Sequence, residues 1–485
     1  MKDQWQYSEG SGLALVDGAS GQSIRFNELT QAAEDTATQL EHWRKRTLHF
    51  VLTRNRVPHA LIIIAAFRSG VPIALVDPEA DRAVLHSLID RYRPESVVGC
   101  AEDIAKFEFE NLRVHSVSGI MAQAIRNGDD TGATSIHPDL ACLLSTSGST
   151  GTPKFVRLTR RNLVTNATDI GRVLGLDEKV CSFAHLKLHY SFGLSVLNSQ
   201  LIAGGTCVLS DAAVVEPAFW EQMRRHKATL LPCVPFHCEY LSKLGLRRLN
   251  LPTLNTVIQA GGACRRDALR GIHSDLTERN GGVFVMYGQT EASPRMTTLD
   301  SPDFFDHSDS VGKPMPSGEI TILDPDGYPC KAGSTGEVVY QGPNVALGYA
   351  TNRADLAKGD EFNGILKTGD LGFLSPEGFL TLRGRIARFA KVQGVRVSLD
   401  DVEALASKEI GQPCYAISAG EQIHLYVEDV RPVQDVARFK SQLKELSLKL
   451  RLPLGTIIVK NIETVPRKAN GKPDCAKLAS LNAIQ

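Results

Sequence analysis

A stretch rich in glycine and hydroxyl side chains, Leu144–Lys154, has the composition of a loop that binds phosphate. Its sequence is LSTSGSTGTPK, and it follows an apolar segment, 141–144, that is expected to be a strand. Glycines let backbone N–H groups turn toward an anion, and Ser and Thr hydroxyls add further donors. It is not a Walker loop, because Phe155 stands where Ser or Thr must follow the lysine. A flexible Ser/Gly linker is the alternative, but the position between regular elements favours phosphate binding.

Alternating helices and strands must position this loop. Apolar spacing predicts helices over 29–43, 60–68 and 82–92, the second closed by Gly70, and strands over 49–53, 73–76 and 96–99. The same alternation recurs between residues 207 and 259. Strands that alternate with helices form mostly parallel sheets through right-handed crossovers. The first part of the chain is therefore predicted to be α/β, with doubly wound sheets.

The character of the chain changes after about residue 300. Short strands alternate with turns such as Asp324–Gly327 and Pro376–Gly378, which predicts a β-rich subdomain over about 300–386. From 387 to 485 the pattern is again mixed, as in a small α+β domain. We therefore expect a large N-terminal domain, 1–386, and a C-terminal domain, 387–485.

Composition restricts the class of partner. The chain has 485 residues, of which 42% are hydrophobic, and 54 basic residues balance 54 acidic ones. A net charge of zero argues against binding to nucleic acid or to an anionic membrane surface. The longest apolar run, 60–67, is far shorter than the roughly 20 residues of a membrane span, so no stable membrane insertion is expected. Ten scattered cysteines without a CxxC pair predict reduced thiols and a cytoplasmic location.

Other short segments, in a fixed order along the chain, resemble the sequence blocks of one enzyme family. They are Phe26–Leu29, Gly70–Pro78, Gln259–Ala263, Tyr287–Glu291, Thr368–Asp370, Gly384–Arg385, Lys391, Gly394, Arg396 and Pro466–Lys472. Together with the phosphate loop they resemble the adenylate-forming superfamily, which contains acyl-CoA synthetases, peptide-synthetase adenylation domains and luciferases. The resemblance covers the whole chain and is most specific to stand-alone acyl-CoA synthetases.

This resemblance implies an ATP-dependent acid–thiol ligase. Such an enzyme converts a small-molecule carboxylic acid and ATP into acyl-AMP and pyrophosphate, then transfers the acyl group to a thiol. The implied cofactors are ATP, Mg²⁺ and CoA. A separate acyl carrier protein with a phosphopantetheine thiol is the alternative acceptor, and an inactive nucleotide-binding homologue is the alternative of another class. The family's C-terminal domain is a mobile lid, whose hinge position is Ala387 here, where relatives often have Asp or Lys.

The resemblance also assigns roles to charged and hydroxyl residues. Both reactants of adenylation are anions, so the site must cancel negative charge. Lys472 is expected to bridge the substrate carboxylate and the α-phosphate, and Thr290 to donate to that phosphate. Glu291 is the expected magnesium ligand, since Mg²⁺ takes a carboxylate together with phosphate oxygens. Asp370 is expected to accept from the ribose hydroxyls, with Arg385 beside the ribose or phosphate.

The remaining nucleotide contacts are expected from the phosphate loop, the adenine-side loop and their neighbours. These residues are Thr146, Ser147, Gly148, Ser149, Thr150, Gly151, Lys154, Gly261, Gly262, Ala263, Tyr287, Gly288 and Gly394.

The segment Leu186–Leu194 indicates the class of acid. Peptide-synthetase domains have Phe-Asp where this chain has Tyr190-Ser191, and a serine cannot neutralise the ammonium group of an amino acid. The segment is more similar to the His-x-x-Gly block of acyl- and aryl-CoA synthetases, although His189 is one residue further from its glycine. His189 is either a catalytic residue, as in that branch, or a buried structural histidine. The predicted wall of the acid pocket is Tyr190, Ser191, Phe192, Val234, Phe236 and Met286, for each of which core packing is the alternative.

Overall fold

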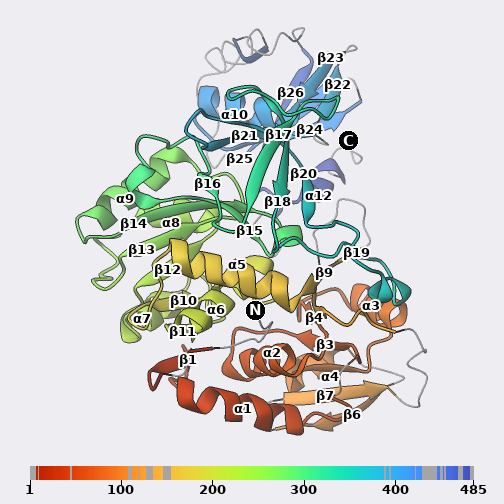
Figure 1. Cartoon of the computed structure of the whole chain (residues 1–485). Coiled ribbons are helices and arrows are strands. Elements are labelled where there is room, and N and C mark those ends of the chain that lie inside the picture. Colours follow the sequence, from red (N-terminus) through yellow and green to blue (C-terminus); the bar gives the residue numbers. More distant parts are fainter. Residues whose placement is uncertain are drawn as a thin grey trace. The chain divides into compact units, whose positions relative to one another are not determined.

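The structure is a computed structural model of the whole chain (Figure 1). It describes residues 7–8, 10–43, 46–107, 112–118, 121–126, 135–145, 154–386, 389–392, 395–420, 422–428, 445–447, 452, 455–467 and 473–480. No helix in these ranges has the length and apolar character needed to cross a membrane. The chain divides into two compact units, one of Met1–Ile320 with Tyr340–Leu366 and one of Thr321–Val339 with Lys367–Gln485.

The first unit contains two large sheets, here called sheet A and sheet B. In sheet order, sheet A consists of β16 (Lys313–Pro314), β15 (Arg295–Leu299), β14 (Gly282–Gly288), β13 (Thr256–Gln259), β12 (Leu230–Cys233), β10 (Cys181–Ala184), β11 (Thr206–Leu209), β1 (Leu13–Asp17) and β2 (Ser23–Arg25). Sheet B consists of β19 (Tyr349–Ala350), β9 (Phe155–Thr159), β8 (Leu140–Ser145), β4 (Ile73–Val76), β3 (His49–Leu52), β5 (Ser96–Cys100), β7 (Met121–Arg126) and β6 (Leu112–Ser116). The central strands of both sheets are parallel. The α/β class predicted from the sequence is confirmed.

Two helices that are buried on all sides join the sheets. Ten residues of α2 (Val57–Ser69) and ten of α6 (Ser191–Ala203) are buried. One continuous apolar core contains side chains of both helices and of strands from both sheets. A helix that is apolar all round must lie inside the molecule, so α2 and α6 lie between sheet A and sheet B. Figure 1 shows α5 (Arg160–Val173) beside α6. The side chain of Thr159 caps the first turn of α5.

The other helices of this unit bury only one face. They are α1 (Phe26–Thr38), α3 (Arg82–Tyr92), α4 (Ala101–Lys106), α7 (Pro217–Arg225), α8 (Pro235–Leu244) and α9 (Arg266–Thr277), with short 3₁₀ turns η1 (Thr290–Ala292), η2 (Ser301–Asp303) and η3 (Ala354–Ala357). The predicted helix 82–92 and strand 73–76 have the expected bounds, and Gly70 ends α2 in the left-handed conformation at φ 75°. The helix predicted over 29–43 was too long. It ends at Thr38, and Leu40 reaches the core from an irregular turn instead.

The second unit has smaller sheets. β17 (Glu319–Leu323), β18 (Gly336–Gln341), β20 (Ile365–Leu374) and β21 (Leu380–Arg385) form one, β22 (Phe389–Val392) and β23 (Val395–Ser398) a hairpin, and β24 (Cys414–Ala419), β25 (Gln422–Glu428) and β26 (Ile457–Ile462) another. The described helices here are α10 (Leu399–Ile410) and α12 (Cys475–Ser480). A separate apolar core joins α10 to the last sheet and the hairpin. The predicted alternation of short strands and turns after residue 300 is thus present.

Candidate active site at the carboxyl edge of sheet A

The loop between β10 and α6, residues 185–190, is held by the side chain of Asn55. Its Nδ2 donates to the carbonyls of Ala184 (2.9 Å) and Leu186 (3.0 Å), and its Oδ1 accepts from the N–H of Leu188 (3.3 Å). Gly193 allows α6 to pack against the same loop, since a Cβ there would lie 2.3 Å from the carbonyl oxygen of Leu186. One buried amide therefore determines the path of the chain into α6.

His189 occupies a buried position at the end of this loop. Its Nδ1 shares a hydrogen bond with Thr53 Oγ1 (3.1 Å), and its ring packs edge-on against Tyr190. Its Nε2 lies 3.7 Å from Asp77 Oδ2, too far for a hydrogen bond, and has no other partner among the described residues. Burial lowers the pKa of His189 to about 4 although Asp77 opposes the shift, so the ring is neutral at pH 7. A neutral ring with one unpartnered nitrogen can accept or donate a hydrogen bond there, according to its tautomer.

The predicted hydroxyl and carboxylate residues meet next to the start of α6. Ser191 Oγ is 3.1 Å from Thr290 Oγ1, which the 3₁₀ turn η1 places immediately after β14. The next carboxylate, Glu291, accepts a hydrogen bond through Oε1 from the hydroxyl of Tyr349 (2.8 Å). Lys154 Nζ lies 3.4 Å from the centroid of the Tyr349 ring. Tyr349 thus connects the end of the phosphate loop with the predicted metal ligand.

The adenine-side loop follows β13 at the same edge. Gln259 Nε2 donates to the carbonyl of Gly262 (2.8 Å) and fixes the turn. Gly261 has a φ of 87°, and a Cβ there would lie 3.3 Å from Val234 Cγ1, so the loops after β12 and β13 touch. Ala263 follows in the same turn. Ligands of parallel α/β sheets bind outside the carboxyl ends of the strands, which is where these loops lie.

Two further predicted positions lie at the end of β14. Tyr287 is half-buried, and Gly288 approaches the neighbouring strand so closely that a Cβ would lie 1.7 Å from the carbonyl oxygen of Pro294. Only glycine fits there, and the shape of the turn that presents Thr290 and Glu291 depends on it.

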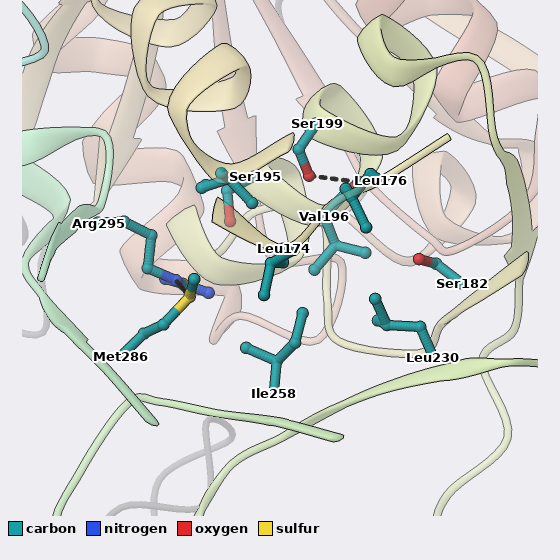
Figure 2. Close-up of a pocket in the computed structure, with 11 residues that line it drawn as sticks. Leu174, Leu176, Ser182, Ser195, Val196, Ser199, Leu230, Ile258, Met286 and Arg295 are labelled. Atoms are coloured by element: carbon teal, nitrogen blue, oxygen red, sulfur yellow. Dashed lines mark hydrogen bonds between the residues drawn. The ribbon is translucent and has the colours of Figure 1, made fainter. Parts of the chain in front are cut away.

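The predicted acid pocket is only partly assembled. Met286 lines a small cavity of about 10 Å³ between α5, α6 and sheet A, roughly the space of one water (Figure 2). Phe192 packs under the guanidinium of Arg295, which lines the same cavity. Phe236, in contrast, is 37% exposed on α8 and packs near Tyr240. A larger polar groove of about 790 Å³ lies beside the start of α5, and none of the predicted site residues lines it.

In the second unit, Asp370 and Arg385 are cross-strand partners of β20 and β21. Arg385 Nε donates to Asp370 Oδ1 (2.9 Å), and the N–H of Arg385 donates to Asp400 Oδ2 (2.9 Å). The Asp370 side chain is buried and that of Arg385 is exposed. The pair therefore places a buried carboxylate next to an exposed guanidinium. Lys472, Gly394, Ala387 and the loop residues 146–151 lie outside the described residues, and their roles stay predictions.

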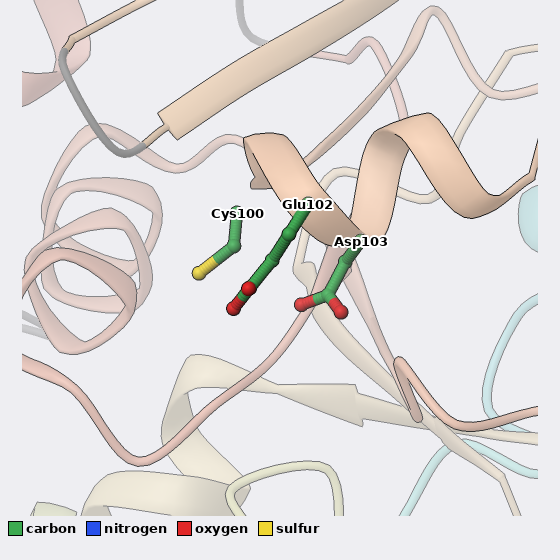
Figure 3. Close-up of side chains that lie close together, drawn as sticks. All are labelled: Cys100, Glu102 and Asp103. Atoms are coloured by element: carbon green, nitrogen blue, oxygen red, sulfur yellow. The ribbon is translucent and has the colours of Figure 1, made fainter.

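A second group of ligating side chains does not suit a metal ion. Atoms of Cys100, Glu102 and Asp103 lie within 4.8 Å of one another (Figure 3). However, Arg54 donates to both oxygens of the buried Asp103 carboxylate, and Arg56 is 3.7 Å from Glu102. Burial also raises the pKa of the Cys100 thiol to about 11, so it keeps its proton. The guanidinium groups already neutralise this cluster.

Several residues that shape the site were not predicted. Asn55, Thr53 and Asp77 come from the ends of β3 and β4 in sheet B, and Tyr349 from a strand 58 residues after Glu291. Their contacts are formed by the tertiary fold. Asp77 lies within the predicted block Gly70–Pro78, but nothing in the local sequence marks Asn55, Thr53 or Tyr349. Arg295 had a recognisable pattern, because it is a single charge in the otherwise uncharged strand RMTTL.

Comparison with known proteins agrees with this geometry. A family model described as AMP-binding enzyme matches residues 3–350. A 2-succinylbenzoate–CoA ligase of Bacillus subtilis is 28% identical over 463 residues, which are 93% of this chain and 92% of that protein. An oxalate–CoA ligase of Arabidopsis thaliana is 31% identical over 69% of this chain and 66% of its own length.

Comparison with solved structures also finds CoA ligases. The o-succinylbenzoate CoA synthetase of Bacillus subtilis, in complex with its acyl-adenylate intermediate, superposes with a TM-score of 0.76 at 25% identity and covers 96% of this chain and 95% of its own. An anthranilate CoA ligase in complex with anthranoyl-AMP has a TM-score of 0.78 at 20% identity over 98% of this chain and 95% of its own, which shows a shared fold. The predictions of an adenylate-forming enzyme and of an acid–thiol ligase are confirmed. The chain belongs to the AMP-binding enzyme family.

Proposed function

We propose that this enzyme activates a small-molecule carboxylic acid as acyl-AMP at the carboxyl edge of sheet A and transfers the acyl group to CoA. The observation that carries the proposal is the contact of Ser191 with Thr290, next to the Glu291–Tyr349 hydrogen bond. These contacts bring hydroxyl donors and a carboxylate together at the carboxyl edge of sheet A, where four parallel strands end. The named CoA ligases among its relatives support CoA as the acceptor.

The donor set fits a magnesium ion. Tyr349 holds one oxygen of Glu291, whereas Oε2 has no hydrogen-bond partner among the described residues. An oriented carboxylate oxygen beside a phosphate loop is the ligand that Mg²⁺ takes in nucleotide sites. Bound there, the ion would neutralise charge on the phosphates.

Different residues of this chain then have different roles in adenylation. An oxygen of the substrate carboxylate attacks the α-phosphorus of ATP, and pyrophosphate leaves. Thr290 donates to the α-phosphate, Lys154 provides positive charge at the end of the phosphate loop, and Lys472 brings the cation that joins the two anions. Asp370 and Arg385 hold the ribose side. In the second reaction the thiol attacks the acyl carbonyl, and AMP leaves with the oxygen that came from the acid.

Three further features belong to the proposal. Residues 387–485 act as a lid that carries Lys472, with Ala387 as the pivot. Ser191 pairs with the Thr290 hydroxyl and carries no charge, which favours acids without an α-ammonium group. The enzyme works in the cytoplasm, in keeping with ten cysteines that are all free.

The decisive experiment is ATP–pyrophosphate exchange over a panel of carboxylic acids, followed by product analysis with either CoA or a phosphopantetheinylated carrier protein. We expect exchange with acids that lack an α-amino group and a thioester with CoA. A thioester on the carrier alone would replace CoA by the alternative acceptor. Exchange with α-amino acids and none with their desamino analogues would refute the substrate class. No exchange with any acid would favour an inactive nucleotide-binding homologue.

A further inference from the structure

Arg295 is a buried guanidinium without an acidic partner. It begins β15, all five residues of which are buried, and its side chain points into the molecule with only 4% exposed. Its Nε contacts Met286 Sδ at 3.3 Å, and its Cζ lies 3.9 Å from the centroid of the Phe192 ring. Within the described ranges no carboxylate lies at ion-pair distance, and neither terminal nitrogen has a hydrogen-bond partner.

Among the described residues, a second deeply buried arginine shows what a structural arginine requires. Arg157 is fully buried, and its nitrogens donate to the carbonyls of Leu347, Tyr349, Lys358 and Gly359 and to the carboxylate of Glu361. Every direction of its guanidinium is used. Arg295 has a ring and a thioether instead, which are weak partners for a desolvated cation.

Burial of an unpaired charge is costly, so a charge kept in this way needs a reason. Desolvation lowers the pKa of Arg295 to about 9, which leaves it charged at pH 7. Leucine or methionine would fill the same place without this cost. A partner that arrives with the substrate would explain why a cation stands here.

The guanidinium faces the cavity beside the predicted acid pocket. Figure 2 shows Arg295 and Met286 reaching into it from sheet A, opposite the serines of α6. Those hydroxyls are already engaged, because Ser195 donates to the carbonyl of Phe192 and Ser199 to that of Val196. Arg295 is therefore the lining group with free donors. Met286 is a flexible side chain that can make room for a small group.

The guanidinium of Arg295 is linked to the site of chemistry through one residue, Phe192. Phe192, on which Arg295 stacks, directly follows Ser191, whose hydroxyl contacts Thr290. An acid whose reacting carboxylate lies at Ser191 and Thr290 would extend its other end along Phe192 toward the guanidinium.

We propose that Arg295 binds a second carboxylate of the substrate, so that the enzyme selects small dicarboxylic acids over monocarboxylic acids of the same length. This inference rests on the proposed function. A guanidinium and a carboxylate form parallel, charge-assisted hydrogen bonds, which give both affinity and orientation. The distal carboxylate would also supply the counter-charge that the fold itself lacks.

The test uses matched acids, each as the dicarboxylate and as the half-amide that keeps its shape but loses one charge. Pyrophosphate exchange is measured with the wild type, with Arg295→Met, which keeps the length, and with Arg295→Lys, which keeps the charge. Arg172→Met, an exposed arginine at the end of α5, is the control. Thermal shifts produced by each acid without ATP give a second readout of binding.

We expect the wild type to prefer the dicarboxylates by roughly 10- to 100-fold in kcat/KM, mostly through KM, as for a hydrogen bond to a charged group. Arg295→Met should lose this preference and the thermal shift while it still turns over the half-amides. Arg295→Lys should keep part of the preference, and Arg172→Met all of it.

An equal response of the wild type to both acids of each pair would overturn the inference, as would a preference that survives in Arg295→Met. If Arg295→Met does not fold, the wild-type comparison and the lysine variant still decide. Absence of exchange with every acid would instead refute the proposed function, so the two failures can be told apart.

Discussion

Removal of the Asn55 side chain should damage catalysis from a distance. Asn55 touches none of the predicted reacting groups, yet its amide makes three hydrogen bonds, one to the end of β10 and two to the loop that carries His189 and leads into Ser191. In Asn55→Ala, the N–H of Leu188 and two carbonyls lose their partners in a buried region.

The magnitude follows from these contacts. A buried hydrogen bond contributes about 1 kcal/mol, so the three together stabilise this path of the loop by about 3 kcal/mol. That energy corresponds to about 100-fold in the population of the ordered loop. We expect the free energy of unfolding to fall by about 3 kcal/mol and the rate of adenylation to fall by roughly 10- to 100-fold, because small misplacements of positioned groups are costly.

The assay combines urea unfolding with pyrophosphate exchange on the same preparation. Asn55→Asp is the informative second variant. It keeps an acceptor for Leu188 but loses both donors and places a charge near Asp211, which accepts the N–H of Asn55 at 3.0 Å. It should be at least as impaired as Asn55→Ala. Gln31→Ala removes an exposed hydrogen bond to Asp35 on α1 and should change stability by less than about 0.5 kcal/mol. Normal exchange by a folded Asn55→Ala would show that this amide does not position the site.

Other predictions concern metal, catalyst, hinge and pH. Glu291→Gln should raise the magnesium concentration needed for half-maximal exchange, and an unchanged titration would leave Glu291 a structural residue. Lys472→Ala should lose roughly 10²–10³-fold in adenylation but still convert supplied acyl-AMP to thioester, and a normal adenylation rate would exclude it as the catalyst. Ala387→Pro should keep exchange and lose thioester formation, because proline fixes φ at the pivot; equal loss of both activities in a folded variant would count against a hinge there. Burial lowers the pKa of His59 to about 4, so the unfolded chain binds more protons between pH 6.5 and 4 and stability falls as pH falls through this window. His59→Gln should make urea unfolding less sensitive to pH in that range, and an unchanged pH dependence would show that His59 does not cause it.

The sequence predicted elements best where local rules decide. The apolar helix α2 and its end at Gly70 were predictable, because glycine readily takes the left-handed conformation that ends a helix. The end of α1 was not, because Leu40 and Trp43 continue the helical spacing although the chain has already turned. Periodicity reports which residues face the core and not which backbone path brings them there.

The same distinction between local sequence and tertiary contacts applies to the residues of the site. Thr290, Glu291, Asp370 and the glycine loops were predicted as site residues from their resemblance to family blocks, and their roles stay predictions. Tyr349, Thr53 and Asn55 were not predicted, since Tyr349 reaches the site from β19 and the other two from the end of β3, and all three bond to it only in the folded chain. Equally, nothing local predicted that Asp370 and Arg385 would be cross-strand partners.

The central claim, that an acid oxygen attacks the α-phosphorus of ATP, is tested most directly by isotope transfer. An accepted acid labelled with ¹⁸O in both carboxylate oxygens is converted to its CoA thioester, and the phosphorus products are analysed by mass spectrometry. The account predicts one ¹⁸O in AMP and none in pyrophosphate, because AMP departs with the oxygen that joined it to the acyl group. Formation of ADP with ¹⁸O in orthophosphate would mean attack at the terminal phosphate, and that result would contradict an acyl-adenylate intermediate.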